Sequence, residues 1–93
     1  MHIEQFNEEK KGVFKAIEET KLAGEMTYVW AGPDKIIIDH TEVNPDFSGK
    51  GVGKELVLEA VKYARDHQVK ILPLCPFAKS VFDKNPDLLD VLF

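Results

Sequence analysis

The chain has 93 residues, enough for one small domain with a single hydrophobic core, which we expect to span residues 1–93. A net charge of −4 without any basic block argues against nucleic acid as a main partner. The single cysteine cannot form an internal disulfide. The first residues lack the pattern of a signal peptide. No apolar run approaches the roughly 18 residues of a membrane-spanning helix. We therefore expect a cytoplasmic protein that does not partner a membrane.

Alternating apolar and polar residues predict strands through the first half of the chain. The expected strands lie at residues 2–7, 13–18, 22–31 and 35–43. Short turns join them, so they should form an antiparallel meander. The alternation places Ile36, Ile38, His40 and Glu42 on one face of the last strand.

The second half of the chain changes to helical spacing. Asn44-Pro45-Asp46 ends the last of these strands, and a helix is expected from residue 52 to about residue 67. A further strand should follow, parallel to the 35–43 strand, and then short helical segments. These three elements are predicted at residues 69–74, 78–84 and 88–93. The predicted fold class is therefore α+β, a mostly antiparallel sheet with a central crossing helix and short C-terminal helices.

A glycine-rich loop directly precedes the long predicted helix. Glycine allows a close approach of the backbone to a ligand, and a helix N-terminus adds free N–H groups and the positive end of a dipole. Together these features predict a phosphate site. The residues that would form it are Ser48, Gly49, Lys50, Gly51, Val52, Gly53 and Lys54. The two lysines are equally well explained as solvated charges.

The spacing of the loop excludes the two commonest nucleotide motifs. A P-loop needs four residues between its glycines and a Ser or Thr after the lysine, but three residues separate Gly49 from Gly53, and Glu55 follows Lys54. A dinucleotide fingerprint needs a third glycine where Leu56 stands.

The segment Val43-Asn44-Pro45, followed by Gly51-x-Gly53 opening an amphipathic helix, resembles motif A of the GCN5-related N-acetyltransferases (GNAT). In that family the loop binds the pyrophosphate of acetyl-CoA. The family usually has Gln or Arg where this chain has Ser48, which removes a side-chain contact and leaves the backbone cradle.

Two further motifs, His40-Thr41-Glu42-Val43 and Cys75-Pro76-Phe77, resemble a subgroup of very small members. The resemblance runs from about Gly12 to Pro86. It implies a minimal GNAT fold, acetyl-CoA or coenzyme A as cofactor and an amine acceptor.

The resemblance also implies roles for residues at the end of the 35–43 strand. GNAT proteins often have a carboxylate there that manages protons, which favours Glu42, and His40 has a suitable intrinsic pKa. The alternative is that both side chains simply face solvent. A backbone N–H near Val43 would stabilise the developing oxyanion.

The family often places a proton-donating tyrosine on the helix after the fifth strand. Phe82 stands at that position and has no proton to donate, so it is predicted only to contact the cofactor. Cys75 ends the strand that should flank the thioester, where it could donate a proton, contact the pantetheine arm or accept the acetyl group. The alternative for Cys75 is inert packing.

These observations favour acetyl transfer from acetyl-CoA to a small amine or an exposed protein amine. The pyrophosphate would lie on residues 49–53, and the pantetheine between the 35–43 and 69–74 strands. Two alternatives remain: double displacement through acetyl-Cys75, and a non-catalytic module that senses acyl-CoA. We expect a monomer, and no residue spacing suggests a metal site.

Overall fold

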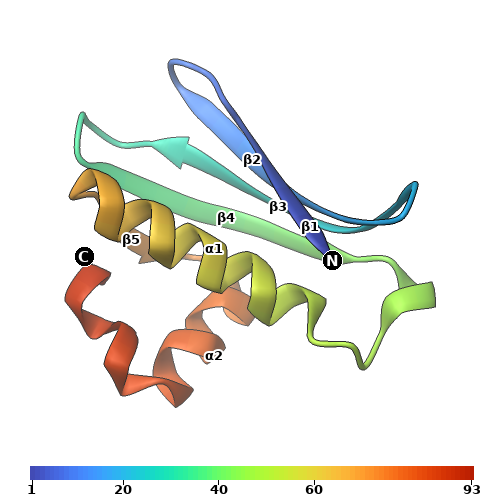
Figure 1. Ribbon diagram of the computed structural model, residues 1–93. Coiled ribbons are helices and arrows are strands. Elements are labelled where there is room, and N and C mark those ends of the chain that lie inside the picture. Colours follow the sequence, from blue (N-terminus) through green and yellow to red (C-terminus); the bar gives the residue numbers. More distant parts are fainter.

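The computed structural model describes residues 1–93, which form a five-stranded sheet with helices on one side (Figure 1). The strands are β1 (His2–Asn7), β2 (Lys11–Glu18), β3 (Lys21–Trp30), β4 (Lys35–Val43) and β5 (Lys70–Pro73). The helices are α1 (Val52–His67) and α2 (Pro76–Lys84), with 3₁₀ turns η1 (Pro45–Phe47) and η2 (Pro86–Val91). No helix is long and apolar enough to cross a bilayer.

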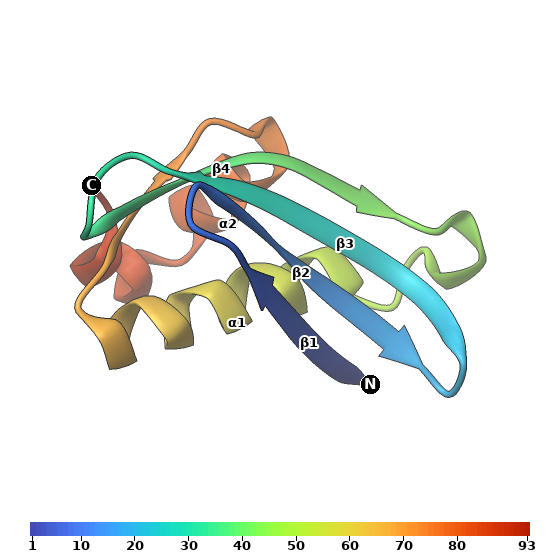
Figure 2. The same ribbon diagram turned by 90° about the horizontal axis from the view of Figure 1, so that it is seen from above.

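Neighbours in the sheet follow the order of the chain, β1-β2-β3-β4-β5. The first four strands are antiparallel, and β5 lies parallel to β4 after the crossover through α1, as seen from above in Figure 2. Short turns allow only antiparallel neighbours, whereas a helical crossover returns the chain in the same direction. The predicted α+β fold and strand arrangement are confirmed.

The helical half of the chain differs from the prediction at its boundaries. Helix α2 begins two residues early, at Pro76, because proline is well suited to the first turn of a helix. The last turn is a 3₁₀ helix at Pro86–Val91. Leu92 then forms a parallel bridge with Ile71, so the C-terminus lies beside the outer edge of β5.

A single core lies between the sheet and the helices, and it contains 22 buried apolar residues. The apolar positions that recur at helical spacing in α1 are all buried there: Leu56, Val57, Ala60, Val61 and Ala64. Alternate residues of strands β2, β3 and β4 face α1 and complete this core. One face of the sheet is therefore covered, and the other faces solvent.

A β-bulge interrupts β4 at Asp39. Thr27 of β3 lies opposite His40, whereas the next residue, Tyr28, lies opposite Ile38, so Asp39 is an extra residue in β4. The Oγ1 atom of Thr27 donates a hydrogen bond of 2.6 Å to Oδ1 of Asp39. The bulge inverts the alternation of side chains along the rest of the strand.

The prediction that Ile36, Ile38, His40 and Glu42 share one face is therefore wrong. The two isoleucines are fully buried on the α1 side. Beyond the bulge, Thr41 lies opposite the buried Met26, so Thr41 points to the α1 side of the sheet. His40 and Glu42 consequently point to the uncovered face.

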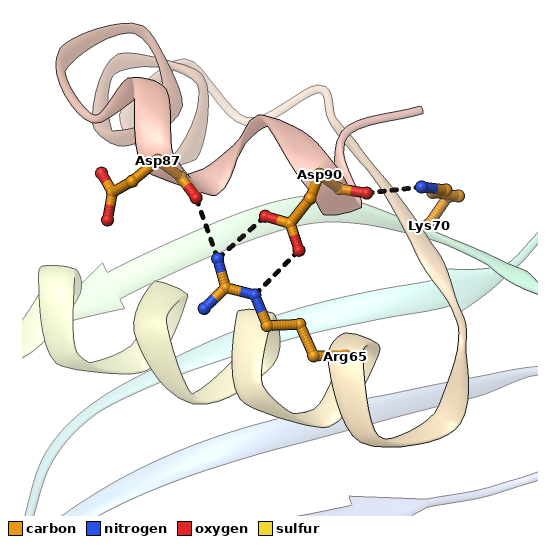
Figure 3. A network of polar contacts seen from close by, with 4 residues as sticks. All are labelled: Arg65, Lys70, Asp87 and Asp90. Carbon is orange, nitrogen blue, oxygen red and sulfur yellow. Dashed lines mark hydrogen bonds and ion pairs between the residues drawn. The ribbon is translucent and has the colours of Figure 1, made fainter.

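The C-terminal turn is attached to α1 by a small polar network (Figure 3). The Nε and Nη2 atoms of Arg65 donate to the carboxylate of Asp90 at 2.9 and 2.8 Å, and Nη2 also donates to the Asp87 carbonyl. The hydrogen bond from Arg65 lowers the pKa of Asp90. Lys70 donates to the Asp90 carbonyl. This network holds η2 beside β5, at the opposite end of α1 from the glycine loop.

Candidate functional site

Helix α1 begins at a glycine that no other residue would replace easily. Gly51 is the N-cap with φ 74° and ψ 20°, a left-handed conformation, and Gly49 has φ 78°. Side chains rarely adopt this region, so glycine is strongly favoured at the entry to the helix. The N-cap also offers no side-chain hydrogen bond to the first turn. The donors of that turn therefore remain available.

The backbone N–H groups of this loop form the most distinctive feature of the site. Ser48 N donates to Pro45 O at 3.2 Å, and Glu55 N donates to Gly51 O at 3.0 Å. No residue from Gly49 to Lys54 donates a backbone hydrogen bond of the kind that loops and helix caps make. The first N–H groups of an α-helix have no acceptor inside the helix. Six consecutive backbone donors without such acceptors therefore lie at the positive end of α1, an arrangement that favours an anion.

A hollow of about 360 Å³ opens beside these donors. Apolar groups from three elements form much of its wall, including Val43 from β4, Phe47 from η1 and Phe77 from α2. The Phe77 ring lies against Gly53, where an added Cβ would be 2.5 Å from the ring. Free backbone N–H groups and an apolar wall therefore lie side by side.

Strands β4 and β5 separate next to this hollow. Parallel pairing joins them from Lys35 to Ile38, and then both Leu74 N and Cys75 N donate to Ile38 O, at 3.1 and 3.0 Å. The chain then turns into α2, while β4 continues to Val43. The space predicted for the pantetheine between the two strands is therefore limited to the end of β4, because hydrogen bonds join the strands from Lys35 to Ile38.

The exposed edge of β4 offers backbone groups to this gap. Asn44 N donates to Ala23 O at 2.8 Å, and hydrogen bonding in an antiparallel pair alternates between residues. Glu42 and His40 therefore bond to β3 through their backbones, while Thr41 and Val43 direct theirs away from β3. The N–H of Val43, which the resemblance implies as an oxyanion donor, is therefore not used in pairing with β3.

Cys75 lies on the α1 side of β4, at the N-cap of α2. Its Sγ donates to Oγ1 of Thr41 at 3.4 Å, and the residue is 6% exposed. Burial raises the pKa of the thiol. The Thr41 hydroxyl, which can donate to the sulfur once the thiol loses its proton, and the backbone of Ala78 and Phe77 lower it by more, so the pKa lies below its ordinary value. The start of a helix favours a thiolate in the same way.

His40 and Glu42 lie on the other face of β4. Their Nε2 and Oε2 atoms are 3.5 Å apart, and the side chains are 64% and 71% exposed. The bulge therefore separates the predicted catalytic residues. The pair His40–Glu42 and the thiol of Cys75 flank the end of β4 from opposite faces.

A family model described as GCN5-related N-acetyl-transferase matches residues 13–91. The chain belongs to the GCN5-related N-acetyltransferase family. The family consists of acetyltransferases, which confirms the predicted enzyme class. A comparison with curated proteins gave no match.

Solved structures agree with this assignment. A GCN5-like protein from Staphylococcus aureus shares 34% identity over 97% of this chain and 87% of its own, with a TM-score of 0.71. The ribosomal-protein-alanine N-acetyltransferase of Brucella melitensis has 19% identity, a TM-score of 0.69 and coverage of 81% and 62%. The ribosomal-protein-S18-alanine N-acetyltransferase of Escherichia coli has 16% identity, a TM-score of 0.70 and coverage of 84% and 53%. The last two share the GNAT fold and are considerably longer than this chain.

One predicted cofactor contact of this GNAT protein does not lie at the site. Phe82 is 2% exposed and packs in the core with Val81 and Ala78, because these residues form the buried face of α2. Its ring presents almost no surface to a ligand. Val52 is also buried and offers only its backbone. Lys50 and Lys54 are exposed beside the loop, and Nζ of Lys50 lies 5.4 Å from the Phe47 ring centroid.

The structure adds two site residues that sequence reasoning missed. Thr41 contacts Cys75, and Phe77 forms the wall of the hollow beside Gly53. Thr41 belongs to the motif at residues 40–43, and Phe77 belongs to the motif at residues 75–77. These two motifs, which carry the resemblance, are the sequence signal that could have identified both residues. The strand pattern gave no reason to select Thr41, because simple alternation placed it away from the predicted site.

Proposed function

We propose that this GNAT protein binds acetyl-CoA and transfers the acetyl group to a primary amine. The observation that supports this most strongly is the run of N–H groups from Gly49 to Lys54 without acceptors in the loop, at the start of α1. A pyrophosphate supplies acceptor oxygens for such donors. Lys50 and Lys54 would add positive charge beside them.

The neighbouring hollow suits the remainder of the cofactor. Phe47 and Phe77 would contact its apolar atoms. Amide groups of the pantetheine arm would pair with the exposed edge of β4, as an additional short strand does. Thr41 and Val43 direct their backbone groups to that edge. The thioester would then lie near the end of β4.

The proposed reaction needs a neutral amine, because a lysine-like amine of pKa about 10.4 is almost entirely protonated at neutral pH. Glu42 or His40 would accept its proton. The amine nitrogen then forms a C–N bond with the thioester carbonyl, and the C–S bond breaks. The N–H of Val43 would stabilise the oxyanion, and the CoA thiolate leaves and takes up a proton.

A second candidate route passes through Cys75, and the lowered pKa of its thiol favours this route. The thiolate would attack the thioester, release CoA and hold the acetyl group until an amine removes it. Mass spectrometry after incubation with acetyl-CoA distinguishes the routes. Acetylation lost in Cys75→Ala supports the covalent route, and full turnover of Cys75→Ala supports direct transfer.

Calorimetry with acetyl-CoA and an assay of CoA release with a panel of amines test the proposal as a whole. We expect binding, and release that depends on the amine. Binding without release from any amine would support the acyl-CoA sensor instead. Absence of binding would contradict the enzyme and the sensor alike.

A further inference from the structure

The face of the sheet opposite α1 and α2 carries no second layer (Figures 1 and 2). We call it the open face. An antiparallel sheet can leave one face in water, and such a face is normally polar. This one is not uniformly polar, since it combines apolar side chains with a row of three carboxylates and one lysine.

The apolar part has a residue on each of the five strands, although between β2 and β3 Val13 and Val29 are diagonal neighbours, because Val13 lies directly opposite Thr27. Phe6 pairs with Val13, Val29 pairs with Ile37, and Ile37 pairs with Leu72. Phe6 is 51% exposed and the other four are partly exposed. A hollow of about 410 Å³ lies over Phe6, Val13 and Val29. We call these five residues the apolar stripe.

A charged row runs beside the apolar stripe. Glu4, Lys15, Glu25 and Glu42 lie directly opposite one another across four strands. Nζ of Lys15 lies 5.5 Å from the centroid of the Phe6 ring, and Glu25 takes part in no ion pair. We call this the acidic row.

The acidic row is unfavourable for the isolated chain. Like charges directly opposite each other on neighbouring strands are destabilising, and Glu25 and Glu42 form such a pair. A hollow of about 470 Å³ is lined by these two residues, by Asp46 and by one cation, Lys21. A partner with positive charge would remove the repulsion.

We infer that the open face binds an amphipathic, lysine-bearing segment of an acceptor protein. Its apolar side chains cover the apolar stripe, and its lysines lie along the acidic row. A second copy of this chain would bring another acidic row and meet repulsion. The inference rests on the proposed function in one respect: the acidic row ends at Glu42, so the segment brings a lysine to the proposed proton acceptor.

The size of the face sets the length of a suitable probe. Five strands about 4.8 Å apart span roughly 20 Å, the length of about 13 helical residues. The probe is therefore a fluorescein-labelled peptide of leucine and lysine with helical amphipathic spacing. A scrambled peptide of the same composition is its control, and fluorescence anisotropy at low ionic strength measures binding.

Two matched variants of the protein locate the binding. Glu4→Lys with Glu25→Lys reverses charge on the open face, and Glu59→Lys with Asp66→Lys makes the same change in net charge on α1. We expect the first variant to bind the amphipathic peptide at least about tenfold more weakly, and the second within about twofold of the unmodified protein. Circular dichroism shows whether each variant folds.

Three results would overturn the inference: equal weakening in both variants, equal binding of the scrambled peptide, or a dimer in light scattering that buries the open face. Calorimetry with acetyl-CoA tests the proposed function separately from the docking surface. Acetyl-CoA binding without peptide binding refutes only the docking surface. Peptide binding without acetyl-CoA binding refutes only the acetyltransferase proposal.

Discussion

The two faces of β4 differ in how they are built. On the α1 side, the glycine loop, Thr41 and Cys75 are held by backbone geometry, burial and hydrogen bonds. On the open face, His40 and Glu42 are exposed, and their side chains lie 3.5 Å apart. The fixed arrangement on the α1 side suits a cofactor of constant structure. The exposed pair on the open face suits an acceptor that completes the site when it binds. The comparison predicts that substitutions on the two faces will affect different steps.

The largest expected effect concerns turnover and the open face. Glu42→Gln removes the proposed proton acceptor without changing the shape of the side chain, so CoA release with an amine should fall about 100-fold. Acetyl-CoA affinity should be unchanged, because the proposed cofactor site lies on the other face. Glu59→Gln, on α1 and outside both proposed binding surfaces, is the matched control for lost charge. Unchanged turnover in both Glu42→Gln and His40→Ala would refute the assignment of the proton acceptor.

The next effect concerns affinity and the α1 side. Gly51→Val places a β-branched residue at φ 74°, which distorts the loop and should weaken acetyl-CoA binding at least about tenfold in calorimetry. Gly32→Val makes the same substitution at another glycine of positive φ, 120°, in the turn before β4 and away from the site, and is the control. Equal loss of affinity in both variants would mean that general instability, and not the loop, is responsible.

A smaller effect is expected where α1 meets α2. In Gly53→Ala the new Cβ would lie 2.5 Å from the Phe77 ring, so the ring must move. Overpacking of this kind costs about 1–3 kcal/mol of unfolding free energy, measurable by urea denaturation. Removing the ring as well, in Gly53→Ala with Phe77→Ala, should recover part of that loss. If the double variant is no more stable than Gly53→Ala, the clash is not the cause.

The smallest effect is a shift in a titration. The Thr41 hydroxyl helps to lower the pKa of Cys75, so Thr41→Val should raise the pH at which the thiolate appears. The sign follows from the loss of a hydrogen bond that favours the charged form. Ultraviolet absorbance of the thiolate against pH measures it, with Thr27→Val as the control on the opposite face. A midpoint that does not rise would show that Thr41 leaves the thiol unaffected.

Much of the fold could be predicted because each local pattern agreed with the final packing. Alternation located the strands, and the residues at helical spacing in α1 are the ones that the core buries. The glycine loop could be predicted because three closely spaced glycines directly precede the residues with helical apolar spacing in the sequence. The C-terminal bridge between Leu92 and Ile71 was not predictable, since it depends on where the end of the chain meets β5.

The main error lay at the bulge, for a physical reason. Strand alternation assumes a regular ladder, and one extra residue at Asp39 moves every later side chain to the other face. Nothing in the local composition marks Asp39 as that residue, since its partner, Thr27, is twelve positions away in the chain. Phe77 was missed for a related reason, because its contact with Gly53 is tertiary.

An amide NMR titration with acetyl-CoA tests the central claim most directly, because each backbone N–H of the cradle reports separately. The account predicts that the resonances of residues 49–54 move most, that those of Thr41 and Val43 follow, and that those of Glu4 and Lys15 stay in place. Saturable shifts confined to the open face, or no shifts at all, would contradict it.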